Sequence, residues 1–172
     1  MRAAIRAIEF LTGSVGLAAA VLVAPLVVAS CYEVFARYIF GAPTIWAFEL
    51  GYMMMGAHFM LGAAYTLKKG AHIRIDLIYA HLRRKKRAWV DLIGYVGLLL
   101  PFLAVLTWYL WDYAYTALQT GEQTGQSAWS PVIWPFRMVY VAAFGLLALQ
   151  VIAEAMKCIG VILDRPFIEE EG

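Results

Sequence analysis

The chain has 172 residues, of which 63% are hydrophobic and only 15% are charged, and its mean hydropathy is +0.70. These proportions exclude an ordinary soluble domain, in which about 45–50% of residues are apolar and about 25% are charged, and they predict an integral membrane protein. The formal net charge of +2 does not indicate nucleic-acid binding, because the basic residues lie beside long apolar segments and suit a membrane topology role.

Four apolar segments are long enough to cross a bilayer. Spanning the hydrocarbon layer takes about 20 predominantly apolar residues per helix, and such segments lie at approximately 10–32, 46–67, 90–111 and 134–156. None of them alternates apolar and polar residues as the strands of a membrane barrel do. We therefore expect an all-α integral membrane protein with four transmembrane helices and short interfacial helices, formed as a single domain over residues 1–172.

The first segment carries Thr12, Gly16, Ala20 and Ala24 at four-residue spacing. Small side chains in one stripe allow close helix packing in membranes, either within the chain or against another subunit, and both readings stay open. Pro25 removes a backbone donor and is expected to kink this helix.

The same segment begins like a secretory signal and ends near a cysteine, Cys31. A signal's apolar region is usually about 7–15 residues long, whereas this one is longer and leads into further spans, so we expect it to be retained. Cys31 and Cys158 fall near opposite faces of the predicted bundle, too far apart for a disulfide within one chain.

A polar corner separates the first two segments, with the sequence ARYIFGAPTIWAFEL at residues 36–50. It brings a cation, a helix breaker, an indole and a carboxylate between two apolar runs. In the second segment, His58 is the strongly polar residue near mid-membrane. We favour a neutral histidine bonded to a neighbouring helix over a functional group.

Basic residues predict the orientation of the chain. Eight of the fourteen Lys and Arg residues lie between Lys68 and Asp91, and four more lie near the two termini. Cytoplasmic loops carry such an excess, so both termini and this loop are predicted to be cytoplasmic. Only Arg37 and Arg137 fall on the other side, together with five of the six tryptophans, which indicate either interfacial anchoring or an aromatic rim that meets a partner.

The sequence offers no set of catalytic groups in mutual reach. It lacks a phosphate-binding glycine loop, a metal-binding histidine pair and a second mid-membrane histidine for haem. We therefore expect no enzymatic activity and no cofactor in this chain. A small stand-alone proton-coupled four-helix transporter, with His58 or Glu49 titrating, is the alternative function.

The corner motif resembles a family signature. RYIFGAPTIWAFEL is similar to the RY-x-F-x-x-P-x-x-W-x-x-E-L pattern of the small membrane subunit (DctQ-like) of tripartite ATP-independent periplasmic (TRAP) transporters; the matching residues are Arg37, Tyr38, Phe40, Pro43, Trp46, Glu49 and Leu50. KKGAHIRIDLIY resembles the family's G-x-H-x-x-x-D element through Gly70, His72 and Asp76, and the loop ending at Arg137 is like the family's loop into the last span.

The resemblance implies a function that composition does not reveal. A soluble periplasmic binding protein would capture an organic acid and deliver it to a complex of this subunit with a large multi-span permease subunit in the bacterial inner membrane. The large subunit would carry the substrate site and use an ion gradient, typically sodium. The small subunit would enlarge the fixed scaffold and help dock the binding protein.

The resemblance also suggests roles for individual residues. Arg37, Tyr38, Trp46 and Glu49 are candidates for the interface with the large subunit or with lipid headgroups, since a guanidinium binds phosphate or carboxylate well. An internal pair between Arg37 and Glu49 is the alternative. His72 and Asp76 are four residues apart and are candidates for ordering the cytoplasmic loop.

Overall fold

The structure is a computed structural model that describes residues 2–70 and 82–163. Its regular elements in this part of the chain are helices, apart from an isolated bridge between Gln123 and Val132. In chain order they are α1 (Arg2–Val21), α2 (Val23–Tyr38), α3 (Ala47–Lys68), α5 (Arg84–Ile93), the π-helical η1 (Gly94–Leu99), α6 (Leu100–Thr120) and α7 (Trp134–Ile162). The predicted all-α fold is confirmed.

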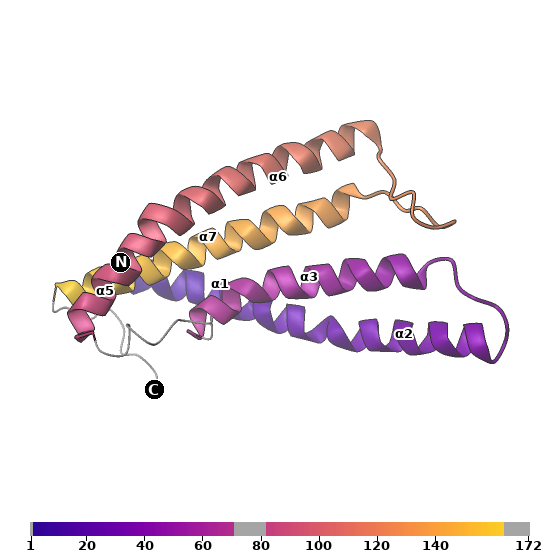
Figure 1. Cartoon of the computed structure of the whole chain (residues 1–172), viewed down its shortest axis with the longest axis horizontal. Coiled ribbons are helices and arrows are strands. Elements are labelled where there is room, and N and C mark those ends of the chain that lie inside the picture. Colours follow the sequence, from indigo (N-terminus) through magenta and orange to yellow (C-terminus); the bar gives the residue numbers. More distant parts are fainter. Residues whose placement is uncertain (1, 71–81, 164–172) are drawn as a thin grey trace.

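These elements form four long rods, because α1 runs on into α2, and α5 and η1 run on into α6 (Figure 1). Among the described residues, three of the rods are long and apolar enough to cross a membrane: Arg2–Tyr38, Arg84–Thr120 and Trp134–Ile162. The fourth rod, α3, is not among these candidates.

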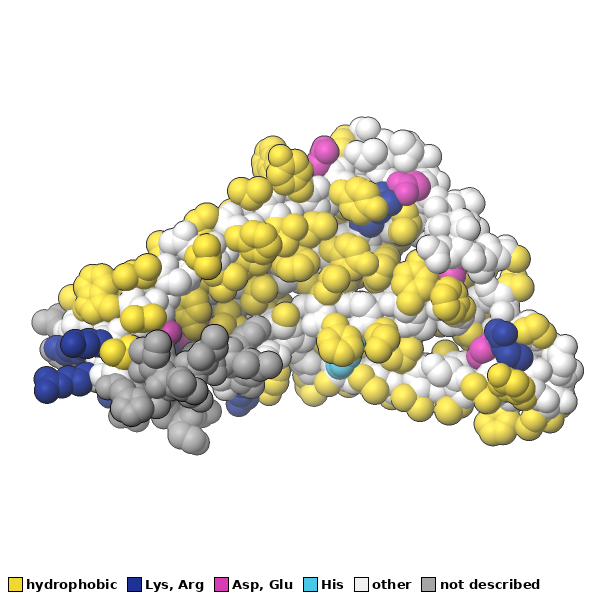
Figure 2. Space-filling model, viewed as in Figure 1, with side chains coloured by type: hydrophobic (Ala, Val, Ile, Leu, Met, Phe, Trp, Pro, Cys, Tyr) yellow, Lys and Arg dark blue, Asp and Glu magenta, His cyan; other side chains and the backbone are white. Residues whose placement is uncertain are grey.

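The central helix of the bundle is α7, which contacts α1, α3, α5, η1 and α6. By contrast, α2 contacts α3 and, more weakly, α1. A small core lies where α3, α6 and α7 meet, built on Leu67, Leu103 and Val151. The outer surfaces of the bundle are largely hydrophobic (Figure 2). Such continuous apolar exposure is not expected of a soluble monomer and fits a protein surrounded by lipid or by another membrane subunit.

The two ends of the bundle differ in character. The connections α2–α3 and α6–α7 lie at one end, here called the loop end, while the N-terminus, the start of α5 and the end of α7 lie at the other (Figure 1). Lys and Arg side chains gather at that second end (Figure 2), here called the basic end.

The helices extend beyond the predicted membrane segments. Helix α5 begins at Arg84, inside the basic run 83–87, and α6 continues to Thr120 rather than ending near residue 111. The end of α6 is set by Gly121, whose positive φ of 63° lets the Glu122 N–H donate back to the Ala117 carbonyl at 3.2 Å. This backbone cap ends α6 at Thr120, nine residues beyond the predicted end of the third segment.

The first rod has a break close to Pro25, where a kink was predicted. The helix is interrupted at Leu22, whose N–H is shared between the carbonyls of Ala18 and Ala19 at 3.2 Å each. Pro25 lies one turn further on and has no N–H to donate to the preceding turn, so the regular bonding pattern fails there.

The predicted small-residue stripe is only half buried. Thr12 and Gly16 are buried, whereas Ala20 and Ala24 are exposed. Residues four apart on an α-helix turn by about 40° more than a full circle, so a stripe at this spacing drifts away from the core within three steps. The stripe therefore provides internal packing at its first two positions only.

Candidate assembly site

The polar corner joins α2 to α3 at the loop end of the bundle. Helix α2 ends at Tyr38, Gly41 adopts a positive φ of 60°, and Pro43 precedes the start of α3 at Ala47. Glycine is suited to that backbone conformation, and proline cannot continue a helix, so the sequence itself enforces the turn.

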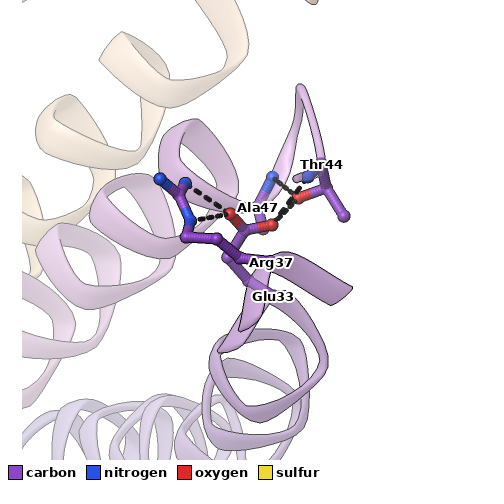
Figure 3. A network of polar contacts seen from close by, with 4 residues as sticks. All are labelled: Glu33, Arg37, Thr44 and Ala47. Carbon is purple, nitrogen blue, oxygen red and sulfur yellow. Dashed lines mark hydrogen bonds and ion pairs between the residues drawn. The ribbon is translucent and has the colours of Figure 1, made fainter. Parts of the chain in front are cut away.

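Glu33 holds this corner together (Figure 3). Its Oε1 accepts hydrogen bonds from Arg37 Nε at 2.9 Å and Nη2 at 2.5 Å. Its Oε2 accepts from the backbone N–H of Thr44 at 2.9 Å and from the Thr44 hydroxyl. One carboxylate of α2 thus binds the cation of its own last turn and the connection to α3.

Thr44 passes this restraint on to the start of α3. Its Oγ1 accepts a hydrogen bond from the Ala47 N–H at 3.3 Å, which satisfies one of the free donors of the first turn. The N-cap of α3 is Trp46, which makes no side-chain cap hydrogen bond. Glu33 accepts the Thr44 N–H, so α2 is tied to the residues that lead into α3.

The predicted site residues of the corner lie in different surroundings. The Arg37 side chain is 52% exposed beside Glu33, and Tyr38 is 80% exposed. Trp46 is half-buried and stacks on Tyr32, with ring centroids 6.0 Å apart. Glu49 is fully buried. The structure therefore brings Arg37 together with Glu33, a residue that the sequence interpretation missed, although its i,i+4 spacing to Arg37 is a recognisable pairing pattern.

Glu49 contacts the other connection at the loop end. Its Oε2 accepts a hydrogen bond of 2.8 Å from Thr124 Oγ1, in the α6–α7 loop. The predicted alternative, an internal pair of Arg37 with Glu49, is not formed in the structure. Arg37 pairs with Glu33 instead, and Glu49 accepts its hydrogen bond from Thr124. Glu49 also stands in the first turn of α3, where the helix dipole favours a negative charge.

A buried arginine fixes the α6–α7 loop from the α7 side. Arg137 is 4% exposed, and its Nη1 and Nη2 each donate to one carboxylate oxygen of Glu122 at 2.6 Å. The guanidinium carbon also lies 3.5 Å from the ring centroid of Tyr113 in α6, a cation–π geometry. The bidentate pair ties the start of the loop to the start of α7.

The hydrogen bonds from Arg137 hold the pKa of Glu122 below its ordinary value of 4.5. A lowered carboxyl pKa stabilises the folded state above the ordinary value, and that stabilisation is lost as the pH falls through the lowered pKa. The loop attachment is therefore expected to persist at neutral pH and to loosen only in acid.

The hydroxyl of Thr124 offers a test of the contact between the two connections. Thr124→Val keeps the shape of the side chain but leaves the buried Glu49 carboxylate without this donor, so we expect a loss of about 1–2 kcal/mol in the free energy of unfolding. Thermal unfolding in mild detergent would measure it. Thr120→Val is the matched control, because that exposed hydroxyl only bonds the Thr116 carbonyl; equal losses in both variants would contradict the assignment.

The predicted bond of His58 to a neighbouring helix is present. Its Nδ1 lies 2.8 Å from the Ala19 carbonyl oxygen of α1, and because a carbonyl can only accept, the ring must carry its proton on Nδ1. His58 thus links α3 to α1 beside the break at Leu22. Cys31 and Cys158 are not joined by a disulfide, in line with the sequence prediction. His72 and Asp76 lie outside the described residues.

A second polar network, at the basic end, was not anticipated. Lys157 Nζ lies 2.5 Å from Glu9 Oε1 and 2.8 Å from Glu154 Oε1, which joins α7 to α1. Gln150 donates to Glu154 at 2.8 Å and accepts from the buried Thr12 hydroxyl at 2.9 Å.

No group of three or more His, Cys, Asp or Glu residues in the described part of the chain could hold a metal ion.

Comparison with known families identifies the chain. No curated protein and no solved structure matches it. A family model described as the DctQ component of tripartite ATP-independent periplasmic transporters matches residues 26–160. This range covers most of the chain, including the corner, the α6–α7 loop and nearly all of α7. The chain therefore belongs to the DctQ family and is a membrane subunit of a TRAP transporter, not an enzyme.

Proposed function

We propose that this subunit scaffolds the large multi-span permease subunit and helps dock the periplasmic binding protein, in uptake of an organic acid driven by an ion gradient. The family supports a tripartite complex. The observation that carries the scaffolding role is the extent of hydrophobic surface that α6 leaves uncovered, since only three of its residues are buried. The substrate and coupling-ion sites, with sodium as the expected ion, would belong to the large subunit.

We further propose that all four rods span the bacterial inner membrane with both termini in the cytoplasm. Helix α3 packs against α1, α2 and α7, and its 22 residues extend about 33 Å, enough to cross the hydrocarbon layer. Helix α3 is less apolar than the three rods that qualify as candidate spans. This is compatible with a span that three neighbouring helices partly shield from lipid. The basic end would face the cytoplasm, in keeping with the positive-inside rule.

At the loop end, we propose that Arg37 and Tyr38 meet the permease or a lipid headgroup, while Trp46 and Glu49 support the corner from inside. Arg37 uses Nε and Nη2 toward Glu33 and still exposes half of its side chain. A guanidinium in that position can add a phosphate or carboxylate partner.

Co-expression with the neighbouring permease gene tests both proposals. The tagged chain should purify in a stable complex with the large subunit, and Arg37→Ala should reduce the recovered permease and the uptake without preventing membrane insertion. Arg84→Ala, at the exposed start of α5, is the control and should have little effect. If assembly and uptake are normal with Arg37→Ala, the proposed assembly role of Arg37 is wrong, and the residue only anchors the chain at the membrane surface. Substrate transport by liposomes that contain this chain alone would overturn the scaffold function in favour of a stand-alone transporter.

A further inference from the structure

One face of the rod formed by η1 and α6 is exposed along most of its length. Its residues follow one another at alternating spacings of four and three, which places them on a single helix face. They are Leu98, Phe102, Val105, Tyr109, Asp112 and Thr116, and all six are exposed. We call this set the α6 stripe. Its large members are far from covered, with Tyr109 68% and Phe102 60% exposed.

The stripe points away from the chain's own core. The residues of α6 that are buried are Leu103, Ala114 and Ala117, each no more than 1% exposed. At about 100° per residue, they stand roughly 180°, 200° and 140° around the helix from Asp112. Asp112 therefore faces directly outward from the bundle, and no other described helix of this chain lies over it.

Asp112 is the one charged residue of the α6 stripe. Within the described part of the chain no cation or donor pairs with its carboxylate, and the nearest arginine along α7, Arg137, is already taken up by Glu122 and Tyr113. Asp112 stands one residue beyond the predicted segment 90–111, at the border between the hydrocarbon layer and the headgroups. A carboxylate there that has no partner in its own chain can pair with a guanidinium or ammonium group of another protein segment. A hollow beside Asp112 is lined by Leu106, Tyr109, Leu110, Asp112, Tyr113 and Thr116, and half of these residues belong to the α6 stripe.

An exposed patch on α2 provides a comparison with the α6 stripe. Its outward residues include Val27, Val28 and Phe35, between 53% and 69% exposed, and these three are all apolar. None of these three residues requires a polar partner. The α6 stripe instead combines aromatic side chains, which are favoured at interface hot spots, with one carboxylate that needs a partner.

We propose that the α6 stripe is the docking face for a transmembrane helix of the large permease subunit, and that this helix carries a lysine or arginine opposite Asp112. The alternating spacing is that of a helix seam, which suits a second helix packed lengthwise. The partner's cation would neutralise the Asp112 carboxylate, and the aromatic rings of Phe102 and Tyr109 would be buried against the partner helix. This assignment rests on the proposed scaffolding function and names the surface that performs it.

Photocrosslinking tests the placement directly. Val105 on the stripe and Val28 on α2 are matched positions, because both are valines, both lie within a helix, and they are 57% and 69% exposed. A benzoylphenylalanine is introduced at each in the co-expressed complex. An adduct with the permease from position 105 and none from position 28 is expected. If the unmodified complex forms but position 105 gives no permease adduct, the α6 stripe is not the docking face.

Substitution of Asp112 tests the charge. Like charges brought together across an interface cost several kcal/mol, so Asp112→Lys should lower the recovery of co-purified permease by about tenfold or more. Asp112→Asn, which keeps an acceptor, should have a smaller effect. Membrane insertion of each variant is checked by the yield of the chain itself. Wild-type recovery with Asp112→Lys would overturn the proposed ion pair, whereas failure of the unsubstituted chain to purify with the permease would instead refute the scaffolding function.

Discussion

Lys157→Met is expected to destabilise the folded subunit by about 3 kcal/mol. Lys157 bridges Glu9 of α1 and Glu154 of α7, whose side chains are only 20% and 16% exposed. Removal of the cation leaves two carboxylates close together with little access to water. Their repulsion and lost solvation both act against the packing of α1 on α7. Unfolding in mild detergent, followed by circular dichroism, measures the loss.

Two further variants show whether charge is the cause. Adding Glu9→Gln and Glu154→Gln to Lys157→Met removes the uncompensated charges and should recover most of the stability, since neutral replacements of an ion cluster are often tolerated. Lys86→Met, on the exposed surface of α5, should leave the unfolding transition unchanged. If Lys157→Met and Lys86→Met behave alike, the basic-end network does not stabilise the fold.

Gly16→Ala is expected to cost roughly 3 kcal/mol, near the upper end of typical overpacking effects. A Cβ at this position would lie 2.7 Å from both Cβ and Cγ of Tyr65, so α1 would have to move away from α3. The atoms it meets belong to the base of the tyrosine side chain, which cannot swing aside without moving the backbone.

Gly62→Ala provides the comparison, because a Cβ there meets no atom within 4 Å. Alanine also has the higher helix propensity, by about 1 kcal/mol, so this variant should be neutral or slightly more stable. The two variants are compared by thermal unfolding under identical conditions. Equal stability of both would refute the close approach of α1 and α3 at Gly16.

The sequence was sufficient to predict the all-helical fold and the corner between the first two segments. Both depend on residues close together in the chain: long apolar runs, and Pro43 between two of them. The corner motif is equally local, and its matching residues alone indicated the family that the family model confirms.

The polar partners could not be predicted in the same way. Thr12 bonds Gln150 across 138 positions, and Thr124 bonds Glu49 across 75. Such pairs depend on which faces of the helices meet, and the composition of a nearly uniform apolar helix does not specify that. Glu33 was missed for another reason: its bond to the Thr44 N–H depends on how tightly the corner folds back, which the spacing of the residues does not specify.

The central position of α7 has a consequence for how the subunit is made. It is the last of the described helices to be synthesised, yet α1, α3 and α6 all pack against it. Until α7 enters the membrane, Glu9 lacks Lys157, Thr12 lacks Gln150, and α6 has no long helix to lie along. Helices α1, α2 and α3 already contact one another without α7. The step that α7 adds is therefore the attachment of α6 to these three helices, which completes the bundle.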